Sequence, residues 1–115
     1  MNLISCASVI AGIWALVNGV LHDYFVLRSE HGKVYNRDLL RLLMDGHILI
    51  TCGAIQAVIS SKLQSHEPWA FYIAGITTIS LLVYCAMIWP FLKSVATIII
   101  NTVLLAILTY AFFQA

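Results

Sequence analysis

The fold of this chain is decided by long apolar stretches, of which the uncharged residues 69–89, WAFYIAGITTISLLVYCAMIW, are the plainest example. A helix of about 20 apolar residues can cross the hydrocarbon core of a bilayer, which is roughly 30 Å thick. Comparable stretches cover residues 2–27, 38–61 and 95–114. Backbone groups in lipid must be satisfied within each segment, and the alternation of a barrel strand is absent, so these stretches predict helices. The sequence therefore predicts an all-α integral membrane protein with four transmembrane helices.

The composition agrees with this interpretation. Hydrophobic residues make up 62% of the 115 residues and charged residues only 10%, whereas a soluble domain has roughly a quarter of its residues charged. A soluble domain of this size could not hide so much apolar surface. The net charge of +1 offers no basic surface for nucleic acid. Cys6, Cys52 and Cys85 lie within apolar stretches and indicate no disulfide framework.

Short connections place consecutive helices side by side in opposite directions, so we expect one domain, residues 1–115, folded as an antiparallel up-down bundle. Lysine and arginine set its orientation through the positive-inside rule, which puts the more basic side in the cytoplasm. Lys62 is on the less basic side, so both termini are predicted to be non-cytoplasmic. The residues on the other side are Arg28, Lys33, Arg37, Arg41 and Lys93.

Local signals mark several helix ends. Asn36 is typical of the residue that caps the start of the second helix, and Pro68 is typical of the first turn of the third. Pro90 lacks an N–H and disfavours helix at the residue before it, so the third helix is expected to end near Trp89.

One face of the first helix carries small residues. At 100° per residue, Ala11, Ala15 and Gly19 fall on the same side as Asn18 and His22, and branched residues fall on the other side. Small residues let helix backbones approach, and branched side chains suit lipid. We therefore expect Ala11, Ala15 and Gly19 to pack against a helix, with Asn18 and His22 facing the bundle or a partner chain.

The second helix has the most informative polar pattern, because Arg41, Asp45 and Gln56 share one face. An ionisable residue inside the membrane costs about 2.5–3.5 kcal/mol on the insertion scale, so Asp45 needs a partner, water or a ligand. Three interpretations stay open at this point. They are an Arg41–Asp45 ion pair along the helix, a solvated cytoplasmic pocket, and lipid head-group binding by Arg37 and Arg41.

His22 and Asp45 should lie at similar depth if the first two helices are antiparallel. We predict that they share a polar cluster near the cytoplasmic surface with Arg41 and Asn18, and we add Gln56 as a candidate ligand- or proton-binding residue. A His–carboxylate pair there would respond to pH. The alternative is that His22 bonds a helix end or a backbone carbonyl.

The histidines do not predict a cofactor. His22 and His47 could ligate a haem from two helices, but the second helix offers little space beside His47. Residues two apart on a helix point about 200° apart, so Asp45 and His47 cannot easily serve one site, and His47 instead points with Thr51. A metal site built from His22, Asp45 and His31 lacks paired ligand spacing, so no metal is predicted.

Polar residues in the last two helices are uncharged. Asn101 can hydrogen-bond a neighbouring helix, an interaction worth about 0.6 kcal/mol. Tyr72, Trp69 and Trp89 suit the interfacial aromatic belt. The further polar residues near one face of each helix are Thr77, Ser80, Tyr84, Ser94 and Thr97.

Three classes of function follow. A small bundle that acts by helix association, as a homo-oligomer or as an accessory subunit of a larger membrane complex, is preferred, with lipid and other membrane subunits as partners. The alternative is a transporter or channel with a cytoplasm-facing polar pocket around Asp45, Arg41 and His22. The third class is a redox or metal-dependent membrane enzyme using the histidines. The sequence has no nucleophile elbow, phosphate-cradling glycine loop or HExxH motif, so other catalysis is not indicated.

Overall fold

Residues 2–114 are described by a computed structural model, and this part of the chain is all-helical. Its four α helices are α1 (Leu3–Arg28), α2 (Arg37–Gln64), α3 (Pro68–Ile88) and α4 (Val95–Gln114), and a short 3₁₀ helix, η1, covers Glu30–Lys33. Within residues 2–114, all four α helices are long and apolar enough to cross a membrane. The chain therefore has the form of a small membrane protein. The bounds lie close to the expected ones, and α2 extends furthest beyond them, to Gln64.

The helix ends follow from local chemistry. The side chain of Asn36 accepts a hydrogen bond from the Leu39 N–H at 2.9 Å, which caps α2. Pro68 lies in the first turn of α3, where its missing N–H costs nothing. Both signals are confirmed. α3 ends at Ile88, one residue earlier than expected and two residues before Pro90.

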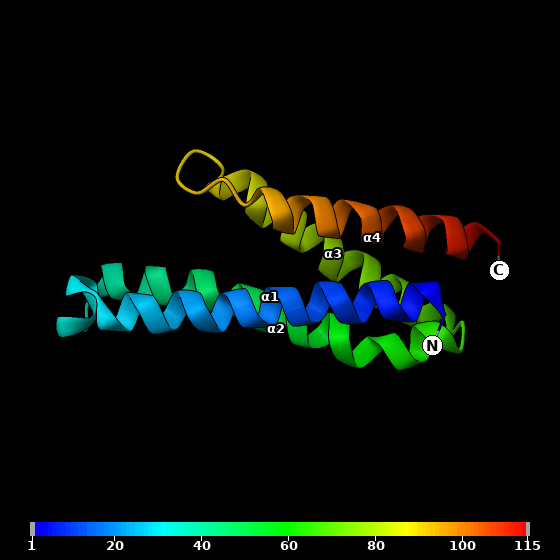
Figure 1. Cartoon of the computed structure of the whole chain (residues 1–115), viewed down its shortest axis with the longest axis horizontal. Coiled ribbons are helices and arrows are strands. Elements are labelled where there is room, and N and C mark those ends of the chain that lie inside the picture. Colours follow the sequence, from blue (N-terminus) through cyan, green and yellow to red (C-terminus); the bar gives the residue numbers. More distant parts are fainter. Residues whose placement is uncertain (1, 115) are drawn as a thin grey trace.

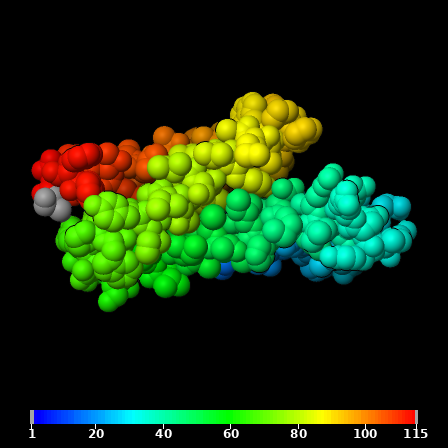
Figure 2. Space-filling view, turned by 180° about the vertical axis from the view of Figure 1, so that it is seen from behind, coloured from blue at the N-terminus to red at the C-terminus, as the bar shows by residue number. Residues whose placement is uncertain are grey.

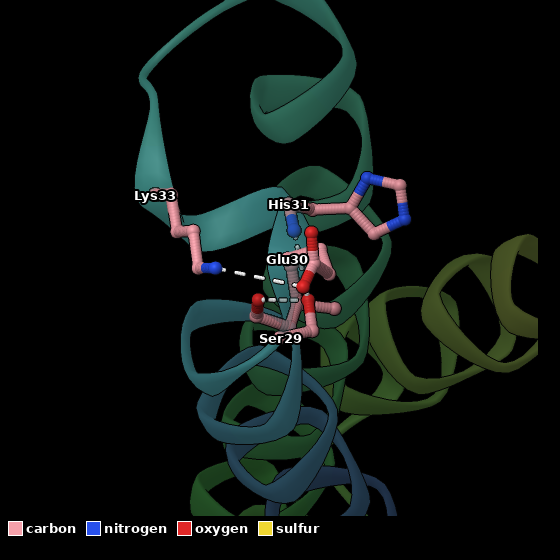
Figure 3. A network of polar contacts seen from close by, with 5 residues as sticks. Ser29, Glu30, His31 and Lys33 are labelled. Carbon is pink, nitrogen blue, oxygen red and sulfur yellow. Dashed lines mark hydrogen bonds and ion pairs between the residues drawn. The ribbon is translucent and has the colours of Figure 1, made fainter.

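The connection between α1 and α2 is a compact turn (Figure 3). The Ser29 hydroxyl donates to the Val26 carbonyl at 2.6 Å and accepts from the His31 N–H at 3.2 Å. The exposed Lys33 ammonium and Glu30 carboxylate form an ion pair at 3.5 Å. These bonds end α1 and start η1, so the chain reverses within a few residues and α2 returns beside α1.

Figure 1 shows the helices as two pairs. α1 and α2 lie side by side along their length, and α3 and α4 lie across the half of this pair that is nearer the termini. The two termini and the α2–α3 turn lie at one end, and the α1–α2 and α3–α4 turns lie toward the other. In Figure 2 the α3–α4 turn, in yellow, diverges from the α1–α2 turn, in cyan. The second pair therefore leaves the α1–α2 turn uncovered.

Glycines bring α1 and α2 into backbone contact. A Cβ atom placed on Gly12 would lie 2.6 Å from the carbonyl oxygen of Gly53, and one on Gly53 would lie 2.5 Å from that of Gly12. Gly19 and Gly46 repeat this contact two turns away, with 2.6 Å from a Gly19 Cβ to the Gly46 oxygen. Real Cβ atoms essentially never come within 3.0 Å of such neighbours. Only glycine therefore permits this close approach.

Apolar clusters fill the space between the two pairs. The cluster nearer the termini includes Leu63, Phe71 and Ala11, and the cluster near the middle includes Ala15 and Leu81. Ala11 and Ala15 are both fully buried, at 0% exposure. The small-residue side of α1 therefore faces the other helices, which leaves its branched side chains on the outside.

Candidate functional site

A buried polar network joins helices near the middle of the bundle. The Gln56 side-chain amide on α2 donates to Asn101 Oδ1 on α4 at 2.8 Å and to Thr78 Oγ1 on α3 at 3.2 Å. All three side chains are completely buried. Asn101 thus makes the interhelical bond that its sequence position indicates. The network fixes the relative positions of α2, α3 and α4, because buried polar groups must stay paired.

The network continues to α1 and along α4. The Ser8 hydroxyl on α1 donates to the backbone carbonyl of Gln56 at 2.6 Å. The Asn101 amide donates to the Thr97 carbonyl at 2.9 Å, and the Trp14 indole of α1 donates to the Thr97 hydroxyl at 3.0 Å. Gln56 Oε1 is buried and has no hydrogen-bond partner within residues 2–114. Polar contacts therefore tie α1 to both α2 and α4.

Two features of this network differ from the expected pattern. Gln56 shares a face of α2 with Asp45, but eleven residues of helix separate them by about 16 Å, and Gln56 bonds to other helices. On α3 the partner is Thr78 rather than Thr77, whose hydroxyl donates to the Ile73 carbonyl of its own helix at 2.8 Å. Consecutive residues point 100° apart around a helix, so the rotation of α3 about its axis decides which of the two threonines bonds to Gln56.

A second polar group lies nearer the α1–α2 turn. His22 Nε2 of α1 is 3.0 Å from the Leu42 carbonyl of α2, which is the backbone bond considered as the alternative for this residue. Asp45 is partly buried and lies near the Tyr84 hydroxyl on α3. His22 and Asp45 therefore have different primary partners, even though both belong to this end of the bundle.

Asp23 is the member of this group that the sequence pattern did not single out. Its carboxylate lies against Gly46, because a Cβ atom added there would meet Asp23 Oδ1. That oxygen is buried and has no hydrogen-bond partner among residues 2–114. The available signal was its position one turn after Gly19, on the face that meets α2. The groups within electrostatic range of Asp23 are His22, His47 and Asp45.

Arg41 and Asn18 do not join the predicted cluster. Arg41 is exposed, and no ion pair connects it to Asp45 within the described residues 2–114. A long arginine side chain at a helix end can place its head outside the apolar layer. The Asn18 amide donates to the Trp14 carbonyl of its own helix at 2.7 Å. Asparagine commonly bonds the carbonyl one turn back, which removes its need for a partner on another helix.

The remaining histidines belong to separate elements. His47 Nε2 and the Thr51 hydroxyl are 3.4 Å apart, which confirms the direction expected for His47. His31 is exposed in η1. No group of three His, Cys, Asp or Glu side chains in residues 2–114 is arranged to hold a metal ion.

The chain thus contains two polar groups with different chemistry. One is a buried network of neutral side chains around Gln56, and the other is a less buried group of carboxylates and imidazoles near the α1–α2 turn. No family model, curated protein sequence or solved structure matches this chain.

Proposed function

We propose that this protein is a small polytopic membrane protein that acts by helix association, as a homo-oligomer or as an accessory subunit of a larger membrane complex. The observation that supports this most is that the polar side chains at the centre of the bundle are buried and hydrogen-bonded across helices. Gln56, Thr78 and Asn101 are fully buried, and the Gln56 amide donates a hydrogen bond to each of the other two. A water-filled passage through the middle of the bundle would expose them, whereas a packed structural unit buries them.

The outer surface supports the same proposal. Large apolar side chains are exposed on every helix, including Ile13 of α1, Val58 of α2, Ile76 of α3 and Val103 of α4. In a bilayer such side chains meet lipid or another helix. Helices in lipid associate by van der Waals packing and hydrogen bonding, so a protein with this surface can offer several faces to a partner.

We also propose that the four helices cross the bilayer in alternate directions with both termini on the non-cytoplasmic side. Two connections that carry basic residues, the α1–α2 and α3–α4 turns, lie toward the end opposite the termini (Figure 1). The positive-inside rule places that end in the cytoplasm. Single cysteines added at each terminus of a cysteine-free variant should react with an impermeant thiol reagent from the non-cytoplasmic face. Reaction only from the cytoplasm would contradict this orientation.

The test of association is the mass of the protein in a membrane-like environment. Light scattering after gel filtration in mild detergent, together with cross-linking in native membranes, should show assemblies larger than the 12.8 kDa chain. Multiples of this mass would indicate a homo-oligomer, and a stoichiometric second protein would indicate an accessory subunit. A monomer without a partner in both measurements would contradict the proposal.

Transport coupled to protons is the second candidate function. It is favoured by Asp23 Oδ1, which is buried, has no hydrogen-bond partner among residues 2–114 and lies within electrostatic range of Asp45. Intramembrane carboxylates commonly mark ion or proton pathways. Proteoliposomes containing the wild-type protein would then show a proton flux that Asp23→Asn and Asp45→Asn both abolish. Equal fluxes in wild-type, variant and protein-free vesicles would exclude this candidate.

A further inference from the structure

Figure 1 shows the termini and the α2–α3 turn at one end of the bundle. A cavity of about 620 Å³ opens at this end. It lies between the start of α1 and the end of α4, and Ile4, Ile107 and Ala111 form its apolar floor. Ligand cavities in proteins commonly measure about 300–1,000 Å³. The space is therefore large enough for part of an amphipathic molecule.

Polar side chains and the exposed Leu3 form the rim of this cavity. The polar members are Asn2, His66, Tyr110 and Gln114, whose side chains can all make hydrogen bonds. α1 contributes its N-terminal end and α4 its C-terminal end, so the partial charges of the two helix dipoles offset each other here. A neutral head with hydrogen-bond acceptors suits such a rim better than an ion does.

His66 occupies an unusual backbone position. Its φ is 57°, in the left-handed region that glycine favours. The His66 N–H donates to the Leu63 carbonyl and the Glu67 N–H to the Lys62 carbonyl, the Schellman pattern in which glycine is the usual residue. The imidazole stacks on Phe71, with ring centres 6.2 Å apart and planes 20° apart. A bulky side chain in this conformation points to a role beyond ending the helix.

The level of the cavity along the membrane normal indicates which kind of molecule it could bind. α1 begins, α2 ends, α3 begins and α4 ends at this level, so it corresponds to the boundary between hydrocarbon and head groups. Trp69 and Tyr72 are exposed next to the same turn, as in interfacial aromatic belts. We propose that this cavity binds one acyl chain of a membrane lipid along its apolar floor, with the ester at the head of that chain hydrogen-bonded by His66 and Tyr110.

The test is native mass spectrometry of the full chain in detergent, titrated with monooleoylglycerol, which has one acyl chain, one ester and no charge. Wild-type protein should form a saturable adduct with a single lipid. Ala111→Trp fills the floor and should weaken this binding by about tenfold or more, since the larger side chain takes the space of the acyl chain. Ala106→Trp is the matched control, because Ala106 is exposed on the same helix, and it should bind like wild type.

His66→Gly tests the hydrogen bond to the lipid ester without destabilising the folded protein. Glycine suits the left-handed position, so thermal stability should stay the same or rise, while affinity for monooleoylglycerol should fall about two- to tenfold with the lost hydrogen bond. Tyr110→Phe should have a similar effect on binding. If Ala111→Trp fails to fold, the His66→Gly titration decides the matter. No saturable single-lipid adduct with wild type, or unchanged affinity in His66→Gly and Tyr110→Phe, would overturn the proposal.

Discussion

The α1–α2 pair and the α3–α4 pair are held together in different ways, although all their helices are apolar and of spanning length. α1 and α2 touch through backbone atoms at Gly12, Gly19, Gly46 and Gly53. In the second pair, a Cβ atom added to Gly75 of α3 would meet nothing within 4 Å. The first pair therefore depends on close backbone approach, and the second depends on side chains.

This difference shows how a bundle can be stabilised in lipid. Apolar surface gains little by leaving lipid for a protein interior, so van der Waals packing and hydrogen bonds must hold the helices together. Glycines supply the packing in the first pair. Gln56, Thr78 and Asn101 supply hydrogen bonds that attach the second pair to the first. We expect the α1–α2 pair to persist when these bonds are removed.

Gly53→Leu should have the largest effect. The atoms in the way of a side chain are the Gly12 oxygen and the Leu16 nitrogen, at 2.5 and 2.7 Å from the Cβ position, and backbone atoms cannot move aside cheaply. We expect a loss of about 1–3 kcal/mol or more in unfolding free energy, measured by circular dichroism during denaturation in detergent. The control Gly75→Ala should change stability by less than about 1 kcal/mol, because the site is open and alanine favours helix. Equal losses in both variants would show that backbone contact is not what holds the first pair.

Gln56→Leu should have an intermediate effect that is specific to the second pair. It removes hydrogen bonds to Thr78 and Asn101, for an expected loss of about 1 kcal/mol. Cys85 of α3 is 1% exposed, so its reaction with a membrane-permeant thiol reagent should speed up as α3 and α4 detach. The Gln56→Leu, Asn101→Leu double variant should lose less than the sum of the single losses. Additive losses would mean that the two side chains act independently.

His22→Ala should have a smaller effect, which concerns the end of the first pair. His22 makes one bond to the Leu42 carbonyl, and such interhelical bonds are worth about 0.6 kcal/mol. Unfolding free energy should fall by about this amount, with no change in the labelling of Cys85. A loss comparable to that of Gly53→Leu would show that this bond, rather than the glycine contact, holds α1 to α2.

Arg41→Ala should have the smallest effect. Arg41 is exposed and is not paired with Asp45, so we expect a change within about 0.5 kcal/mol in the same denaturation assay. Asp45→Ala then provides the comparison, because Asp45 lies near Tyr84. If Arg41→Ala and Asp45→Ala have equal and substantial effects that are not additive in the double variant, the ion pair considered from the sequence exists in solution.

Several features were accessible from the sequence because they depend on local or one-dimensional signals. The long apolar stretches indicated the helices, Asn36 and Pro68 marked helix starts, and the small residues of α1 marked the face that meets its neighbours. Asn101 was recognised as an interhelical donor or acceptor, because a lone amide among apolar residues needs a partner.

Other features were decided only by the tertiary structure. In the sequence, Asp23 lies near the end of the first helix and has no evident partner; in the structure, it packs against Gly46 of α2. Gln56 shares a helix face with Asp45 in the sequence pattern, but its hydrogen-bond partners are on α3 and α4. The choice of Thr78 over Thr77 likewise depends on how α3 is rotated. A helical pattern fixes which residues share a face, but the partner of each face is set by backbone approach and helix rotation, and these arise only when the helices pack.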